Sequence, residues 1–179
     1  FAWHKMLMKG NQKINSGQWR FHDEPMQVIS GAIGREIVHF EAPPSSAVPK
    51  EMEAFILWFN KTAPDGTSPM SNPIFRAAIA HLYFESIHPF EDGNGRIGRA
   101  ISEKALSQSL GQPLLISLSY ILEKHKKEYY NALKKAQRSN DVTAWISYFQ
   151  DVVMASQKAA HTQIAFILNK TKFLDLHNA

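Results

Sequence analysis

The feature that most constrains the fold is a glycine-rich stretch that interrupts a long helical pattern. It reads HPFEDGNGRIGR and occupies residues 88–99. From Asn72 up to this stretch, apolar residues recur at helical spacing, with a proline in the first turn. The face that this spacing predicts to be buried comprises Phe75, Ala78, Ile79, Leu82, Tyr83 and Ser86. Beyond the stretch the helical period continues through Ile97, Ile101, Ala105, Leu106 and Leu110. Gly111 then provides a residue type favoured at helix C-termini, so the pattern predicts two helices joined at residues 88–99.

The remainder of the chain is also predicted to be mainly helical. Helical periodicity covers residues 48–62, 126–137 and 142–170, separated by short breaks with Pro, Gly or Asn-Asp. Between residues 26 and 40, two β-prone runs flank a loop that contains Gly31 and Gly34, which predicts a β-hairpin. No repeat or linker divides the chain. We therefore expect one all-α domain over residues 1–179 that carries a small β-hairpin.

Composition is typical of a soluble domain, with 44% hydrophobic and 20% charged residues. No apolar run approaches the roughly 18 residues of a membrane span, so a cytoplasmic protein without a membrane association is expected. Cysteine is absent, which excludes disulfides and thiolate metal sites. The net charge is only +4, and the one basic cluster, residues 124–128, is interpreted as a solvated helix face, so nucleic-acid binding is not indicated. The chain opens with Phe1 rather than Met, and we expect it to be part of a longer protein.

The glycines at positions 93, 95 and 98 have the spacing of a dinucleotide-binding loop. That loop requires a buried strand before the first glycine and alternating strands and helices around it. Here the preceding element is a predicted helix, and the phosphate-binding pattern G-x-x-x-x-G-K-[ST] is also absent. The spacing of the glycines is therefore not evidence for a dinucleotide cofactor.

The residues around these glycines suit chemistry on a phosphate. A glycine-rich turn that leads into a helix presents free N–H groups and the positive end of the helix dipole, and Gly93 and Gly95 allow close approach of an anion. Arg96 and Arg99 lie one turn apart and offer two guanidinium groups. A carboxylate just before the turn, Asp92, is placed to hold Mg²⁺. His88, with an ordinary pKa of about 6.5, suits a general base.

Each of these residues also has a structural interpretation. His88 could cap the preceding helix, and Asp92 could form an Asx-type turn with Gly93. The arginines could pair on the surface with Glu85, Glu91 or Glu103. Surface pairing alone does not explain a base, an acid, glycines and two arginines within twelve residues.

The segment resembles the signature of the Fic (Fido) family, H-x-F-x-[DE]-[GA]-N-[GK]-R-x-x-R. Its specified positions are filled by His88, Phe90, Asp92, Gly93, Asn94, Gly95, Arg96 and Arg99. The order of the predicted helices and the upstream hairpin also resembles the family. The resemblance implies a mostly helical Fic domain and transfer of AMP from ATP to a Ser, Thr or Tyr hydroxyl of a target protein, with release of pyrophosphate. The alternatives are transfer of another nucleotide or phosphate-linked group, removal of AMP, and a regulatory module that binds a nucleotide without turnover.

The resemblance also implies a role for each residue of the segment. His88 would take the proton of the target hydroxyl, and Asp92 would hold Mg²⁺ against the α- and β-phosphates. Gly93, Asn94 and Gly95 would form the turn that holds the anion, while Arg96 and Arg99 would grip the β- and γ-phosphates. Phe90 is expected to anchor the loop in the core. A lysine at position 95 accompanies Doc-like members that transfer phosphate, so Gly95 favours AMP transfer.

Further expectations concern the residues outside the segment. The hairpin resembles the family's flap, which binds an extended segment of the target, and Ile37, Val38 and His39 could supply its edge. Tyr130 and Gln137 match positions near the adenosine, whereas Tyr129 is expected in the core. Many members carry an inhibitory motif [ST]-x-x-x-E-[GN], and the nearest match here, Ser119 with Glu123, fails at Lys124. We expect that element upstream in a longer protein or in a partner. A homodimer is also compatible with the resemblance.

Overall fold

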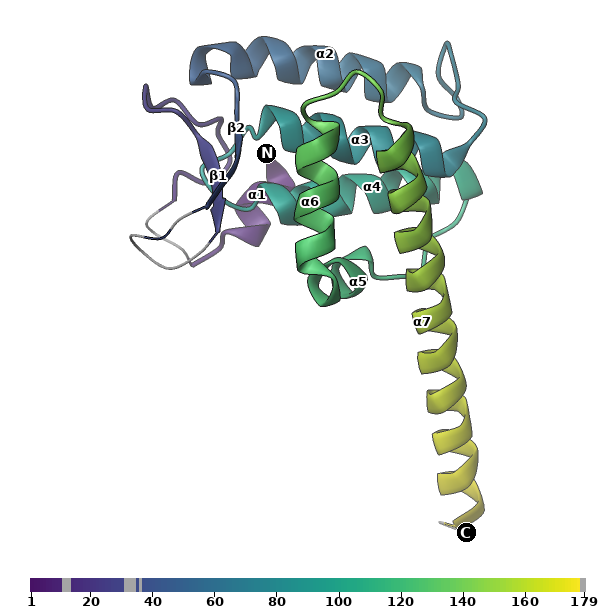
Figure 1. Ribbon diagram of the computed structural model, residues 1–179. Helices are drawn as coiled ribbons and strands as arrows, with labels where there is room; N and C mark the ends of the chain where they lie inside the picture. Colours follow the sequence, from purple (N-terminus) through teal and green to yellow (C-terminus); the bar gives the residue numbers. More distant parts are fainter. Residues whose placement is uncertain (11–13, 31–34, 36, 178–179) are drawn as a thin grey trace.

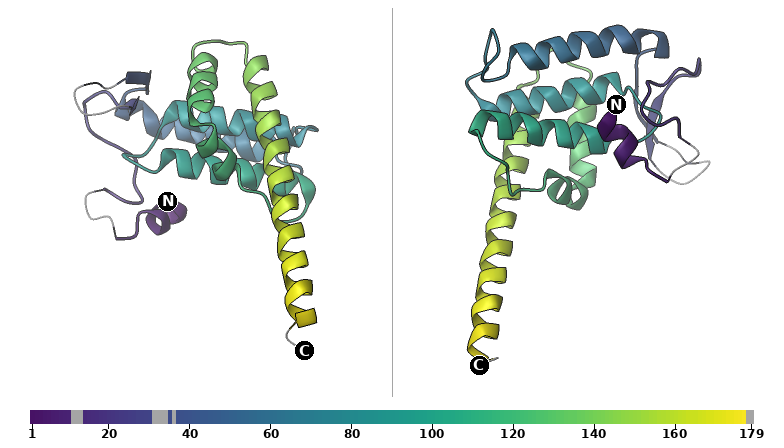
Figure 2. Two further views of the ribbon diagram at one scale, coloured as in Figure 1. Left: turned by 60° about the horizontal axis from the view of Figure 1, so that its bottom comes forward. Right: turned by 180° about the vertical axis from the view of Figure 1, so that it is seen from behind.

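Two helices joined by the 88–99 segment form the centre of the molecule. The computed structural model describes residues 1–10, 14–30, 35 and 37–177. Helix α3 (Pro73–Ile87) and helix α4 (Asn94–Leu110) pack side by side, and α2 (Val48–Lys61) lies against α3 (Figure 1). Helices α6 (Lys126–Ala136) and α7 (Thr143–His177) cross this layer (Figure 2), and α5 (Leu118–Lys124), which precedes α6 in the chain, packs against α7. Short elements α1 (Ala2–Leu7) and η1 (Ser45–Ala47) complete the order.

The central helices begin and end at residues suited to those positions. Asn72 caps α3, because its side-chain oxygen accepts from the amides of Ile74 and Phe75, and Pro73 occupies the first turn. Helix α4 ends at Gly111, which adopts a left-handed conformation with φ of 66°. The predicted mostly helical domain and its helix-loop-helix unit are confirmed. Helix α7 extends beyond the predicted residue 170 and projects from the body of the molecule (Figure 1), whereas α1 and α5 were not predicted.

The predicted buried face of α3 is wrong in detail. Phe75 is exposed, and three other members of that face are only half-buried: Ile79, Tyr83 and Ser86. The fully buried positions instead include three polar residues, Arg76, His81 and Glu85. Because α2, α4 and α7 all pack on α3, the helix is enclosed on several sides and hydrophobic spacing does not identify one face. On α4, the predicted core residue Leu110 is exposed.

A short antiparallel strand pair forms the predicted hairpin. Strand β1 (Gln27–Ser30) pairs with β2 (Ile37–Glu41), with an irregular register between Val28 and Ile29. Gly31 and Gly34 of the predicted turn lie outside the described residues. The basic residues 124–128 are exposed, as predicted. None of the helices in the described part of the chain is both long and apolar enough to cross a membrane.

Candidate active site

His88 is held in a rare backbone conformation at the end of α3. It has φ of 50° and ψ of 60°, and it is the one non-glycine residue with positive φ in the described part of the chain. Its amide donates to the Phe84 carbonyl at 3.0 Å, so His88 does cap the helix, as the structural interpretation proposed. A bulky residue in this region is strained, and such strain concentrates at functional sites. The capping and functional interpretations are therefore compatible.

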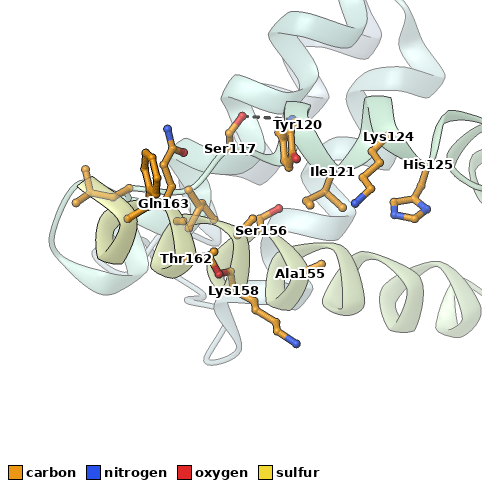
Figure 3. A pocket seen from close by; sticks show the side chains of 15 residues that line it. Ser117, Tyr120, Ile121, Lys124, His125, Ala155, Ser156, Lys158, Thr162 and Gln163 are labelled. Atoms are coloured by element: carbon orange, nitrogen blue, oxygen red, sulfur yellow. Dashed lines mark hydrogen bonds between the residues drawn. The ribbon is translucent and has the colours of Figure 1, made fainter. Parts of the chain in front are cut away.

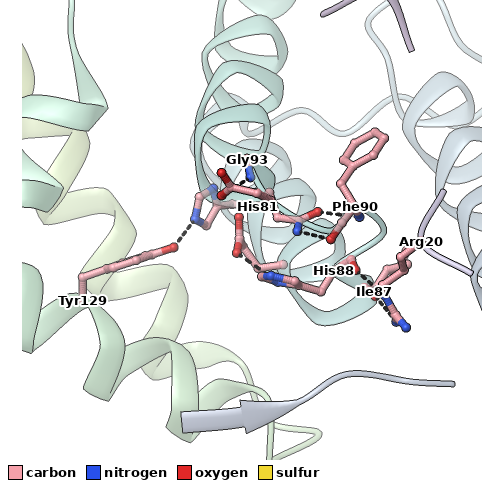
Figure 4. A network of polar contacts seen from close by, with 10 residues as sticks. Arg20, His81, Ile87, His88, Phe90, Gly93 and Tyr129 are labelled. Atoms are coloured by element: carbon pink, nitrogen blue, oxygen red, sulfur yellow. Dashed lines mark hydrogen bonds and ion pairs between the residues drawn. The ribbon is translucent and has the colours of Figure 1, made fainter. Parts of the chain in front are cut away.

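A buried arginine holds the backbone around His88. The Arg20 side chain is only 2% exposed, and its Nε donates to the His88 carbonyl at 2.8 Å. The remaining guanidinium nitrogens donate to the Ile87 carbonyl, the Pro43 carbonyl and Ser45 Oγ. Arg20 therefore ties the end of α3 to the chain that follows the hairpin. Figure 4 shows its contacts with Ile87 and His88. Sequence reasoning missed this residue, because it lies far from the segment in sequence and belongs to no motif.

The loop between the two helices is closed by a buried side chain. Asn94 is 2% exposed; its Oδ1 accepts from the Phe90 amide at 2.9 Å, and its Nδ2 donates to the Phe90 carbonyl at 2.7 Å. Both polar groups of the amide are thus used within the loop, and Asn94 shapes the turn. Phe90 is buried against Phe84 and Trp19, which agrees with its predicted anchoring role.

Helix α1 supports the same loop through a second histidine that sequence reasoning missed. His4 Nδ1 accepts from the Gly17 amide at 2.8 Å, so its Nε2 carries the proton and donates to the Asp92 carbonyl at 3.0 Å. The imidazole also stacks on Phe90, with the ring centroids 3.9 Å apart. These contacts bring residues near the chain start to the loop, a placement that no local sequence signal indicates.

The start of α4 has the features of an anion-binding site. Gly93 occupies the N-cap position with φ of 84°, and it provides no side-chain cap for the free N–H groups of the first turn. A Cβ on Gly93 would lie 3.1 Å from the Leu7 side chain, which adds a steric reason for glycine. Uncapped N–H groups and the helix dipole favour a negatively charged ligand at this end.

The two arginines of the segment contact Asp92 and Ser119, and neither makes a salt bridge with Glu85, Glu91 or Glu103 among the described residues. Arg96 Nη2 lies 3.2 Å from Asp92 Oδ2, and both side chains are about half exposed. Arg99 Nε donates to Ser119 Oγ on α5 at 2.8 Å. Asp92 Oδ1 also accepts from the amide of Gly93, the next residue, whereas an Asx-type turn would use the amide two residues on. Glu91 instead binds Asn15, at 2.9 Å from its side-chain nitrogen.

Asp92 is the residue of the segment that fits a divalent cation. Its half-exposed carboxylate lies beside the uncapped N-terminus of α4, an end that favours a negatively charged ligand. The described residues contain no cluster of three or more His, Cys, Asp or Glu side chains that could hold a metal ion alone. Magnesium is commonly held by one or two carboxylates together with substrate phosphates and waters. The residues therefore fit an ion that arrives with a nucleotide.

Burial changes the acid–base properties of His88. Removal from water, followed by the influence of Arg20, lowers the pKa of His88 to about 4, although the Glu85 carbonyl and Asp92 oppose the shift. The imidazole is therefore neutral at pH 7 and has a free nitrogen that can accept a proton. With this lower pKa, His88 is a weaker base than a histidine with the ordinary pKa of about 6.5.

The residues expected near the adenosine and the target lie on neighbouring elements. Tyr130 and Gln137 belong to α6 and its C-terminal end, and α6 contacts β2. The Nε2 atom of Gln137 is buried without a hydrogen-bond partner. Ile37, Val38 and His39 all lie in β2, whose outer edge carries no strand in the described chain, and Val38 is 43% exposed. Tyr129 is a core residue, as expected, and its hydroxyl lies 2.9 Å from His81 Nε2 (Figure 4).

A cavity of about 1060 Å³ lies away from this segment, between α5 and the middle of α7. Figure 3 shows its lining, which includes Tyr120, Ile121, Ser156 and Gln163. None of the residues from 88 to 99 contributes to it. The volume of this cavity therefore does not identify the 88–99 segment, where a strained residue, an uncapped helix N-terminus and charged side chains lie together.

Comparison with known proteins agrees with this architecture. Over 90% of this chain and 46% of the other, the structure superposes on a Fic family protein from Desulfovibrio desulfuricans, with a TM-score of 0.73 and 27% identity. A Fic-domain-containing signalling protein from Bacteroides thetaiotaomicron shares the fold, with a TM-score of 0.66 at 23% identity over 89% of this chain and 59% of that one.

Curated relatives match over a shorter range. A protein adenylyltransferase Fic of Culex quinquefasciatus is 30% identical over 100 residues, which are 56% of this chain and 18% of that protein. A probable protein adenylyltransferase of Aquifex aeolicus is 29% identical over 98 residues, or 55% of this chain and 27% of the other. The chain thus matches about a quarter or less of each relative. The model of the Fic/DOC family matches residues 1–106, more than half of the 179 residues, and the chain therefore belongs to the Fic/DOC family.

Proposed function

We propose that the chain is a protein adenylyltransferase domain that transfers AMP from ATP to a Ser, Thr or Tyr hydroxyl of a target protein. The observation that carries the proposal is the junction of α3 and α4. A neutral imidazole in a strained conformation ends one helix, and an uncapped N-terminus with two arginines begins the next. The names of the matched relatives support the reaction type.

In this mechanism the first turn of α4 binds the polyphosphate. Its N–H groups, together with Arg96 and Arg99, face negative oxygens and orient the α-phosphorus toward the target hydroxyl. Arg96 would exchange its contact with Asp92 for the nucleotide, because the pair is exposed and therefore weak. Asp92 would hold Mg²⁺, which would offset negative charge on the pyrophosphate leaving group.

His88 acts as the general base in this mechanism. Its free ring nitrogen accepts the hydroxyl proton while the hydroxyl oxygen bonds to the α-phosphorus and the bond to pyrophosphate breaks. Arg20 and Asn94 contribute by fixing the two backbone segments that flank His88, through contacts with the His88 and Phe90 main chain. A fixed base lowers the entropic cost of reaching the reactive arrangement.

The target is proposed to bind along β2. The outer edge of that strand offers backbone groups to an extended peptide, and α6 with Tyr130 and Gln137 lies beside it. The buried Gln137 Nε2 without a partner is a donor that an adenine or ribose acceptor would satisfy. We further propose that residues 1–179 form a single Fic domain.

The proposal is tested by incubating the protein with ATP, Mg²⁺ and a cell extract and measuring modified proteins by mass spectrometry. A mass increase of one AMP group on a hydroxyl residue is expected with wild type, and its loss is expected with His88→Ala. Parallel reactions with CTP, UTP and GTP identify the nucleotide. An unchanged yield with His88→Ala would exclude His88 as the base, and tight ATP binding without any product would favour a nucleotide-binding regulatory module.

A further inference from the structure

A buried carboxylate lies next to the His88 imidazole, and the proposed mechanism does not use it. Glu85 is three residues before His88 on α3 and is only 4% exposed. Its Oε2 lies 3.8 Å from His88 Nδ1, within ion-pair range but too far for a good hydrogen bond. Glu85 Oε1 and His88 Nδ1 are both buried and have no hydrogen-bond partner. The oxygen nearest the unpartnered Nδ1 is Oε2, so a small shift of either side chain would bring Nδ1 and the Glu85 carboxylate within hydrogen-bond distance, and we expect this contact to tighten during function.

A glycine on the neighbouring helix makes room for this carboxylate. A Cβ added to Gly98 on α4 would lie 2.5 Å from Glu85 Oε1 and 3.4 Å from Glu85 Cδ. The first distance is far inside van der Waals contact, so any larger residue at position 98 would displace the carboxylate. Gly98, the third glycine of the segment, is thus explained by the space for Glu85 and not by the phosphate.

The charged groups around the pair come from four parts of the chain. Arg99 on α4 and the Tyr129 hydroxyl on α6 act electrostatically with Glu85, whereas Arg20 and Asp92 act on His88. Burial raises the pKa of Glu85 to about 7, although Arg99 opposes the shift. A carboxyl group kept in such surroundings next to an essential base is a common arrangement for tuning that base.

We infer that Glu85 is a positioning residue for His88, a role that rests on the proposed function. Its carboxylate accepts the Nδ1 proton, which leaves the Nε2 lone pair free to take the target hydroxyl proton. Nδ1 keeps its proton during that transfer, and the resulting imidazolium is stabilised by the negative charge of Glu85. The Glu85 main chain also acts on the His88 ring and raises its pKa, so the side chain adds to an interaction that the backbone already provides.

Four variants distinguish this role from simple packing. Glu85→Leu removes both the acceptor and the charge, whereas Glu85→Gln removes the charge and keeps an acceptor. Gly98→Ala displaces the carboxylate and leaves Glu85 in the chain. Glu103→Gln is the matched control, because Glu103 also interacts electrostatically with Arg99 but its carboxylate accepts from the Leu118 amide. Thermal unfolding of each variant establishes that it is folded.

The first readout does not depend on catalysis. Nitrogen-15 NMR of the histidine rings reports which nitrogen of His88 carries the proton, and its signal is assigned by its loss in His88→Ala. Wild type and Glu103→Gln are expected to show the Nδ1–H tautomer at pH 7.5. Glu85→Leu is expected to show a mixture, with Glu85→Gln between the two. An unchanged tautomer in both Glu85 variants would overturn the inference, even if the protein proved to catalyse another reaction.

The second readout is steady-state AMP transfer. For Glu85→Leu we expect kcat to fall about 10- to 100-fold, because part of the general-base contribution is lost, with KM for ATP changed less than about threefold. Gly98→Ala is expected to behave similarly, and adding it to Glu85→Leu should cause little further loss. A rise in KM with kcat unchanged would contradict the inference and assign Glu85 to balancing Arg99. If wild type transfers no AMP, the proposed function fails while the NMR result still decides the role of Glu85.

Discussion

Replacement of Arg20 tests whether one buried guanidinium holds the backbone around His88. In Arg20→Met the apolar part of the side chain is retained, but three carbonyl oxygens and Ser45 Oγ lose their donor. A buried acceptor left without a partner costs roughly 1–3 kcal/mol, and removal of a buried charge offsets part of the sum. We therefore expect a loss of about 3 kcal/mol in the free energy of unfolding.

For a chain of 179 residues, that loss corresponds to a decrease in Tm of about 6–12 °C. Arg20→Lys should lose less, because it keeps the charge, but one ammonium group does not reach four acceptors spread around a planar guanidinium. Arg138→Met is the control, since Arg138 is exposed and its replacement should change stability by less than about 0.5 kcal/mol.

The assay is thermal unfolding followed by circular dichroism, combined with hydrogen exchange of the amides in the 88–99 segment. Faster exchange confined to this segment and to the chain after the hairpin is expected in Arg20→Met, with kcat reduced. A Tm equal to that of Arg138→Met would refute the reasoning, because the hydrogen bonds of Arg20 would then contribute nothing net.

Three other predictions follow from the same contacts. Burial lowers the pKa values of His81 and His88 to about 4, so stability should fall as the pH decreases from about 6.5 to 4. The pKa of Glu85 is raised to about 7, so its protonation stabilises the fold as the pH decreases and offsets the uptake of one proton by the histidines in the unfolded chain. Glu85→Gln should therefore steepen the slope of unfolding free energy against pH between about 4.5 and 6.5 by roughly 1.4 kcal/mol per pH unit. An equal slope in chemical denaturation would contradict that assignment. Tyr129→Phe should lose about 1–2 kcal/mol, measured the same way, because His81 Nε2 is left buried without its partner, and a variant as stable as wild type would argue against that bond. Asp92→Asn should bind ATP without Mg²⁺ at least as well as wild type, because Arg96 is released, but should lose the enhancement by Mg²⁺ in calorimetry; retention of that enhancement would exclude Asp92 as the ligand.

The helix-loop-helix unit was predictable because its signals are local. A capping asparagine with a following proline, a glycine at the far end and helical spacing in between all lie within about forty residues, and each acts through the adjacent backbone. The strand pair was predictable for the same reason, since β-prone runs were separated by a glycine-containing loop.

The supports of the loop were not predictable from the sequence. Arg20 and His4 reach the segment across 68 and 88 positions of the chain, and only the tertiary fold brings them there. Glu85 was read as a surface partner for the arginines, because helical spacing did not indicate that α3 is enclosed on several sides. Asn94 was assigned to the anion-holding turn, but the sequence did not indicate that its buried side chain binds the Phe90 main chain.

The most direct test of AMP transfer with His88 as general base uses ATP that carries distinguishable labels on its α- and γ-phosphorus. The protein is incubated with this ATP, Mg²⁺ and a cell extract, and label on protein is compared between wild type and His88→Ala. We predict that His88→Ala reduces the α-label on protein by at least about 100-fold, and that the γ-label on protein, which kinases of the extract supply, is the same with wild type and His88→Ala. Transfer of the γ-label that is lost in His88→Ala, or α-label transfer that persists in His88→Ala, would contradict the account.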